Sequence, residues 1–186
     1  MISGMAFSAQ KAYPEAIQHF ISAEVIAKAT DPSRLNESFY FQIGAAYERK
    51  GDYDQAEKYF RKCLQLAPDS SETMNYLGYM WAEHGMKLDE ARDLIEKAVK
   101  AEPKNAAYLD SLGWVLYKLN HPKAGLDYIR KAIELSGEPD PTVFEHLGDI
   151  YSALNEADKA REAWRKSLSL EANDEVRKKL DAAVSK

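Results

Sequence analysis

The sequence predicts an all-α protein built as a solenoid of antiparallel helix pairs, and three observations lead to this prediction. Single glycines recur at intervals of 40, 34, 35 and 35 residues. An aromatic or apolar residue follows each of them three positions later. Between the glycines, apolar residues recur at three, four and seven positions, which is the spacing of an amphipathic helix. Self-similarity at about 34 residues is typical of helical repeat arrays, and the register is set here by Gly4, Gly44, Gly78, Gly113 and Gly148.

Each interval holds two amphipathic runs joined by a turn such as Lys50-Gly51-Asp52, so each repeat is predicted to be a helix, a turn and an antiparallel helix. Met1 falls inside the first helix of this register, so we expect a truncated first repeat and a chain cut from a longer protein. We expect one domain over 1–186, with repeats over 1–36, 37–70, 71–105, 106–140 and 141–174 and a capping helix over 175–186.

The repeat glycines lie inside the predicted first helices, where glycine costs about 1 kcal/mol relative to alanine. A close approach between helices must offset that cost. The small surfaces expected to face the glycines are Ala56, Ala91 and Ala160. The bulky residues expected to fill the space between successive repeats are Phe60, Ile95, Ile129 and Trp164.

The second repeat shows the whole residue pattern, at Tyr40, Ile43, Gly44, Tyr47, Ala56, Phe60 and Pro68. This pattern resembles the tetratricopeptide repeat, and the resemblance covers essentially the whole chain. It implies a right-handed superhelix in which the first helix of each pair lines an inner groove. The fourth repeat departs from the pattern, because Leu109 replaces the first aromatic residue and Gly125 replaces an alanine. We therefore expect its packing to differ from that of the other repeats.

Composition excludes several classes of protein. The chain is 45% hydrophobic and 30% charged, as is usual for a soluble globular domain. No apolar run approaches the roughly 20 residues that a membrane-spanning helix needs. Lysine and arginine total 25 against 30 acidic residues, and no basic face stands out to bind nucleic acid.

Residues with catalytic or metal-binding potential are scattered. His19, His84, His121 and His146 fall in four different repeats, with no pair at ligand spacing, so no metal site is predicted. Cys63 stands where other repeats carry alanine or serine, and we expect it to be a small buried core residue. No glycine-rich phosphate loop or catalytic triad motif occurs. The sequence therefore predicts no enzyme and no cofactor.

A candidate binding stripe runs beside the packing face of the first helices, at their fifth, ninth and twelfth positions. Its further members are Ala45, Glu48, Ala82 and Ser152. The candidate partner-binding residues are Phe41, Asn75, Tyr79, Asp110, Trp114, Tyr117, Glu145 and Asp149. This stripe is acidic and aromatic.

The stripe favours a protein or peptide partner that carries basic and apolar residues. Relatives that grip the C-terminal carboxylate of heat-shock chaperones have Lys, Arg and Asn at such positions, whereas here Asp110, Glu145 and Asp149 would repel a carboxylate. Trp114 is expected to be exposed in the groove, although the aromatic residues could instead pack against the second helix of their own repeat.

Two function classes remain open. The first is an interaction module that binds a peptide or helical segment of a partner in its concave groove. The second is a structural or self-associating element of a larger protein, with a possible homo-oligomer through the truncated first repeat. The phrase Tyr76-Leu77-Gly78-Tyr79 resembles bacterial repeat proteins of the cell envelope and of secretion. The sequence assigns no cellular compartment.

Overall fold

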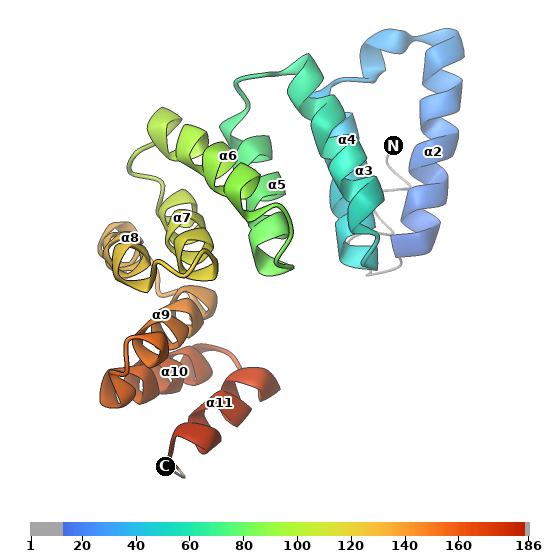
Figure 1. Ribbon diagram of the computed structural model, residues 1–186. Coiled ribbons are helices and arrows are strands. Elements are labelled where there is room, and N and C mark those ends of the chain that lie inside the picture. Colours follow the sequence, from blue (N-terminus) through green and yellow to red (C-terminus); the bar gives the residue numbers. More distant parts are fainter. Residues whose placement is uncertain (1–12, 185–186) are drawn as a thin grey trace. The chain divides into compact units, whose positions relative to one another are not determined.

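The computed structural model describes residues 13–184, and every regular element in that range is helical (Figure 1). The sequence predictions that rest on Met1, Gly4 and Phe7 lie outside these residues. The helices are α2 (Tyr13–Thr30), the short 3₁₀ helix η1 (Pro32–Arg34), α3 (Glu37–Lys50), α4 (Tyr53–Leu66), α5 (Ser71–Glu83), α6 (Leu88–Ala101), α7 (Ala106–Lys118), α8 (Pro122–Leu135), α9 (Pro141–Ala153), α10 (Ala157–Leu170) and α11 (Asp174–Val184).

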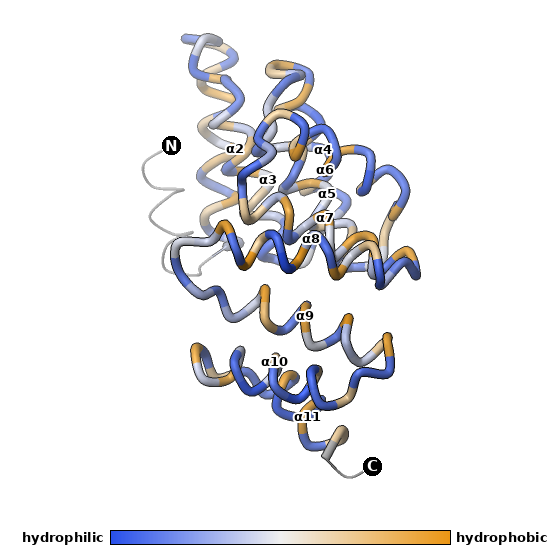
Figure 2. The backbone as a smooth tube through the Cα atoms, turned by 90° about the vertical axis from the view of Figure 1, so that its left-hand side faces the viewer, coloured by the Kyte–Doolittle hydropathy of each residue, from blue (hydrophilic) through white to orange (hydrophobic). Residues whose placement is uncertain are grey.

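The predicted all-α architecture of helix pairs is confirmed. The helices α3, α5, α7 and α9 begin at residues 37, 71, 106 and 141, which are the first residues of the intervals read from the glycines. The partner helices α4, α8 and α10 pack most extensively on α3, α7 and α9 respectively. Hydrophobic and hydrophilic residues alternate along the helices, as Figure 2 shows. Each pair therefore buries the apolar stripes of two amphipathic helices against each other.

Two compact units can be distinguished along the chain, with the boundary inside α5, between Met80 and Trp81. The core of the N-terminal unit consists of Ala16, Ile17, Phe20, Phe39, Tyr40, Ile43, Ala46, Tyr59 and Cys63. The core of the C-terminal unit consists of Leu126, Ile129, Leu147, Ile150, Tyr151, Ala160, Ala163, Trp164, Val176 and Leu180. Cys63 is fully buried, as predicted, and burial raises the pKa of its thiol to about 12.

The turns between paired helices use residues that tolerate a left-handed backbone. Gly51 and Gly85 have φ values of 83° and 65°, and Asn120 and Asn155 take the same region at 65° and 61°. Glycine adopts this conformation without steric cost, and asparagine is among the few other residues that visit it routinely. Asp140 accepts a hydrogen bond from the backbone N–H of Thr142 at 2.8 Å and so caps the N-terminus of α9.

Three of the repeat glycines are required because a bulky side chain of the paired helix lies directly on them. A Cβ atom added at Gly44 would lie 2.8 Å from the Phe60 ring, and one at Gly113 would lie 2.7 Å from the Ile129 side chain. Gly148 meets the Trp164 indole in the same way. The predicted close approach is thus confirmed, and its nearest atoms belong to these bulky residues rather than to the alanines that we expected to face the glycines.

The unusual Gly125 of the fourth repeat is explained by its neighbour Gly113. A Cβ atom at Gly125 would lie 2.6 Å from the carbonyl oxygen of Gly113, which is much closer than real side chains approach a backbone atom. The helices α7 and α8 therefore meet through two glycines. The departure from the family pattern marks tighter packing at this crossing.

Candidate partner-binding site

A cleft of about 840 Å³ opens in the C-terminal unit between α11 and the helices α7, α9 and α10. Tyr117 of α7 and Asp149 of α9 line it, and both belong to the stripe that the sequence predicted. Lys179 of α11 and Arg161 of α10 contribute positive charges. The remaining lining residues are Ser152, Ala153, Asn155, Ala157, Ala160, Trp164, Ala182 and Ala183. We refer to this space as the Tyr117–Lys179 cleft.

Lys179 joins two of the predicted acidic residues. Its ammonium donates to the Glu145 carboxylate at 2.8 Å and to the Asp149 carboxylate at 2.6 Å. Burial alone would lower the pKa of Lys179, but these two hydrogen bonds and charges outweigh it and raise the pKa. The other oxygen of Asp149 accepts a hydrogen bond from the indole N–H of Trp164 at 2.9 Å. Asp149 is therefore held in place in the cleft lining, and Glu145, which is not part of the lining, is tied to the cleft through Lys179.

The third acidic residue, Asp110, lies in a buried pair. Its carboxylate oxygens are 3.0 and 3.1 Å from Nδ1 of His146 on α9, and only a few per cent of either residue is exposed. Burial by itself would lower the pKa of His146, but the charge and hydrogen bond of Asp110 raise it above the ordinary value of 6.5. Asp110 therefore holds α7 to α9 rather than facing a partner.

Trp114 is buried, so the prediction that it is exposed in the groove is wrong. Only 6% of the surface of Trp114 is exposed. The His146 ring stacks on the indole at 4.0 Å between ring centroids, and the Tyr117 ring lies at 5.0 Å. The indole N–H donates to Glu83 at 2.9 Å. His146, which covers Trp114, comes from the first helix of the next repeat. Positions within a single repeat therefore do not predict this burial.

The remaining predicted residues lie in the N-terminal unit. Phe41 packs against the rings of Phe60 and Tyr76, at centroid distances of 5.5 and 5.1 Å, so it contacts the second helix of its own repeat. Tyr79 is half-buried. The Oδ1 atom of Asn75 is buried and accepts no hydrogen bond, which is an unfavourable state for an amide oxygen.

Sequence reasoning missed the residues that pair with the predicted acids. The four histidines are scattered, and the partner of His146 is 36 residues away, so no local motif indicates this pair. Lys179 falls in the predicted capping helix, outside the five repeats. Its distance of 34 residues from Glu145 is one repeat length, so extending the repeat register into α11 would have placed the two side chains together.

Two further observations concern the residues that the structure describes. They contain no group of three or more histidine, cysteine, aspartate or glutamate side chains that could hold a metal ion. None of the described helices is both long and apolar enough to cross a membrane.

Models of the tetratricopeptide repeat match residues 38–70, 86–141 and 142–174. The chain belongs to the tetratricopeptide repeat family. Tetratricopeptide repeats generally mediate protein–protein interactions, and proteins built from them are generally non-enzymatic scaffolds.

Similar proteins include bacterial members of this family, in agreement with the predicted bacterial type. A TPR repeat-containing protein of Pseudomonas aeruginosa is 37% identical over 102 residues, which are 55% of this chain and 17% of that protein. The type IV pilus assembly protein PilF of the same organism is 27% identical over 135 residues, which are 72% of this chain and 53% of PilF. The chain thus spans about half or less of the length of these relatives.

Solved structures agree in fold. The crystal structure of a thermophilic TPR protein in Thermus thermophilus superposes with a TM-score of 0.76 at 17% identity, and covers 98% of this chain and 96% of that one. The fold class of an all-α tetratricopeptide solenoid is therefore shown both by the sequence models and by the arrangement of the helices.

Proposed function

We propose that this chain is a protein-interaction module and that its C-terminal unit binds a segment of a partner protein in the Tyr117–Lys179 cleft. The segment carries a lysine or arginine beside an apolar side chain. The observation that carries the proposal is the cleft itself, which is lined by the half-buried Tyr117 ring and by the Asp149 carboxylate.

Charge in the cleft favours a basic residue. Glu145 and Asp149 together carry two negative charges, whereas Lys179 supplies one positive charge. The charge of Arg161, the other cation of the lining, is compensated by Asp158. One negative charge therefore remains at a half-buried position, where the attraction of a cation is screened less than on an open surface. Burial, and then the nearby Asp149, raise the pKa of Tyr117, so its phenol is neutral and can serve as an apolar anchor.

The cleft is tested with one peptide panel synthesised in basic, neutral and acidic versions, each titrated by fluorescence anisotropy. Tyr117→Ala should weaken the basic version about tenfold or more, because an anchoring aromatic residue contributes about 2 kcal/mol. Glu145→Gln should reduce both the affinity and its dependence on salt. The matched controls Tyr128→Ala and Glu134→Gln on α8 lie outside the cleft lining and should leave binding unchanged.

Two outcomes would overturn the proposal. Either the basic version binds no more tightly than the neutral version, or Tyr117→Ala leaves the affinity of the basic version unchanged. Trp114 is not a suitable test position, because removal of its buried indole would destabilise the fold.

Self-association within a larger assembly is the second candidate function, and α2 carries the observation that favours it. Val25 and Ile26 are 64% and 61% exposed, and large exposed apolar residues side by side can form a contact surface. PilF, one of the relatives, is an assembly protein by name. Sedimentation velocity over a concentration series tests this candidate. The double change Val25→Ser with Ile26→Ser should abolish any dimer. A wild-type chain that remains monomeric over the whole concentration series would exclude self-association.

A further inference from the structure

A second groove of about 720 Å³ lies in the C-terminal unit along α9 and α10. Its floor is apolar, with Phe144, Leu147 and Tyr151 of α9 and Ala163 of α10. None of the residues that line the Tyr117–Lys179 cleft takes part in it. We refer to it as the α9–α10 groove.

The rim of the α9–α10 groove is basic. Lys159, Arg165 and Lys166 are exposed on α10, whereas the lining contains one acidic residue, Glu162. Lys159 is paired with Glu156, so part of its charge is compensated. This local excess of positive charge is opposite to the chain as a whole, which has a net charge of −5.

The basic side chains lie over the aromatic floor. The Lys166 ammonium is 5.9 Å from the centroid of the Phe144 ring, and the Lys159 ammonium is 5.4 Å from that of Tyr151. On the neighbouring helix α8, Arg130 donates to the Tyr151 hydroxyl at 3.0 Å. These contacts hold the cations beside the apolar floor, where an acidic group could reach them while an apolar neighbour is buried.

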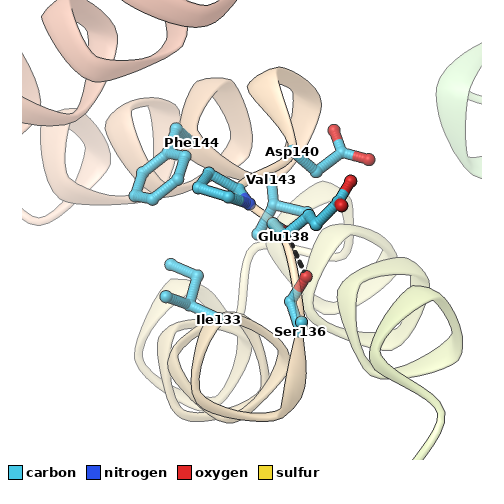
Figure 3. Close-up of a pocket in the computed structure, with 8 residues that line it drawn as sticks. Ile133, Ser136, Glu138, Asp140, Val143 and Phe144 are labelled. Carbon is cyan, nitrogen blue, oxygen red and sulfur yellow. Dashed lines mark hydrogen bonds between the residues drawn. The ribbon is translucent and has the colours of Figure 1, made fainter.

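Phe144 also lines a smaller pocket of about 210 Å³ beside the loop between α8 and α9 (Figure 3). In Figure 3 the Phe144 ring and the Ile133 side chain lie on one side of this pocket, and the carboxylates of Glu138 and Asp140 lie on the other. The hydroxyl of Ser136 donates to the backbone carbonyl of Glu138 and closes the loop. The pocket and the α9–α10 groove thus share Phe144, with acidic residues beside the pocket and basic residues on the rim of the groove.

We propose that the α9–α10 groove binds a second partner segment, in which acidic side chains lie on one side of an aromatic or aliphatic anchor. The anchor enters the pocket beside Phe144 and Ile133, and the acidic side chains lie toward Arg165 and Lys166. A segment in the reverse direction would place its carboxylates near Glu138 and Asp140, and like charges at such short range disfavour that orientation. This inference is independent of the Tyr117–Lys179 cleft and selects a partner of the opposite charge.

The test starts from a random peptide library displayed on phage. The library is first depleted on the double variant Arg165→Glu with Lys166→Glu, which changes two exposed residues. The remaining peptides are then selected on the wild-type chain, so that only binders that need this rim are retained. The expected survivors carry aspartate or glutamate beside phenylalanine or leucine. A survivor is then synthesised and titrated by fluorescence anisotropy at several salt concentrations.

The double variant should weaken the synthesised peptide more than about tenfold, and the wild-type affinity should fall as salt increases. Phe144→Ala should weaken it as well, with a circular dichroism melt to show that the variant remains folded. The matched control Lys97→Glu with Lys100→Glu makes the same change of charge on α6 and should have no effect. Tyr117→Ala should also leave this peptide unaffected.

Three results would overturn the proposal. The first is a depleted library with no survivors. The second is a set of survivors that are basic or that lose affinity on Tyr117→Ala, which would place them in the other cleft. The third is a dimer of the wild-type chain in sedimentation velocity that disappears in the Arg165→Glu and Lys166→Glu variant, because the groove would then bind a second copy.

Discussion

Lys179 on α11 donates a hydrogen bond of 2.6 Å to the carboxylate of Asp149 on α9, so the final helix is tied to the helix pair before it by charge as well as by packing. Val176 and Leu180 place the apolar face of α11 on the same core. The ion pair therefore has a structural role that can be separated from partner binding.

Lys179→Ala should lower the free energy of unfolding by about 1–2 kcal/mol, between the values for exposed and buried ion pairs, because Lys179 is one-third exposed. Loss of the lysine leaves Glu145 and Asp149 to repel each other. Hydrogen exchange should rise first in α11. The control Lys178→Ala removes a neighbouring exposed lysine of the same helix and should change stability by less than about 0.5 kcal/mol. Equal effects of the two variants would contradict the structural role of Lys179.

The pair of His146 and Asp110 predicts a dependence of stability on pH. The pKa of His146 is raised in the folded chain, because the carboxylate of Asp110, with further contributions from Glu83 and Asp149, outweighs the effect of burial. The folded state therefore binds the proton more tightly than the unfolded state. Its stabilising effect is fully present below the unfolded pKa, near 6.5, and is lost as the pH rises through the folded pKa.

Urea titrations at a series of pH values measure this effect. The wild-type free energy of unfolding should decrease above pH 6.5, by about 1.4 kcal/mol for each pH unit by which the two pKa values differ. His146→Gln should flatten the profile in that range. The control His121→Gln changes an exposed histidine on the turn before α8 and should leave the slope as it is. A slope that survives in His146→Gln would assign the titration to another group.

Gly125 provides a test against the family pattern. Gly125→Ala introduces the residue that other repeats carry, yet its Cβ would collide with the Gly113 carbonyl oxygen, so we expect a loss of about 1–3 kcal/mol. The matched control is Gly137→Ala, where no atom lies within 4 Å of the added Cβ, and which should be neutral or slightly stabilising. Thermal melts of both variants decide the question. A neutral Gly125→Ala would show that α7 and α8 can separate at little cost.

Phe60→Ala removes a fully buried ring that packs on Gly44, Phe41 and Tyr76. The expected loss is about 3–5 kcal/mol. Because helical repeats couple mainly to their neighbours, hydrogen exchange should increase in α3, α4 and α5 before it increases in α9 and α10. A uniform increase over all described helices would contradict this local coupling.

The fold could be predicted from the sequence because one register repeats along the chain. Gly44, Gly113 and Gly148 occupy equivalent positions. The first helix of each of these repeats begins at the residue that the register of the glycines predicts. Contacts between consecutive repeats were less predictable. Burial of Trp114 depends on His146, and the position of Asp149 depends on Lys179, and these pairs are visible only when adjacent repeats are compared side by side. The α9–α10 groove had no sequence signal, because its basic residues fall on the solvent face of an ordinary amphipathic helix.

The contact between glycine and bulky side chain also bears on how such chains diversify. Gly44 fits Phe60, whereas Gly113 and Gly125 together fit Ile129 and the close backbone of α7. A single helix moved by recombination would bring one half of such a fit without the other. A whole helix pair would bring both halves. The helix pair is therefore the smallest segment that evolution or a protein engineer can exchange between chains of this kind without breaking this contact.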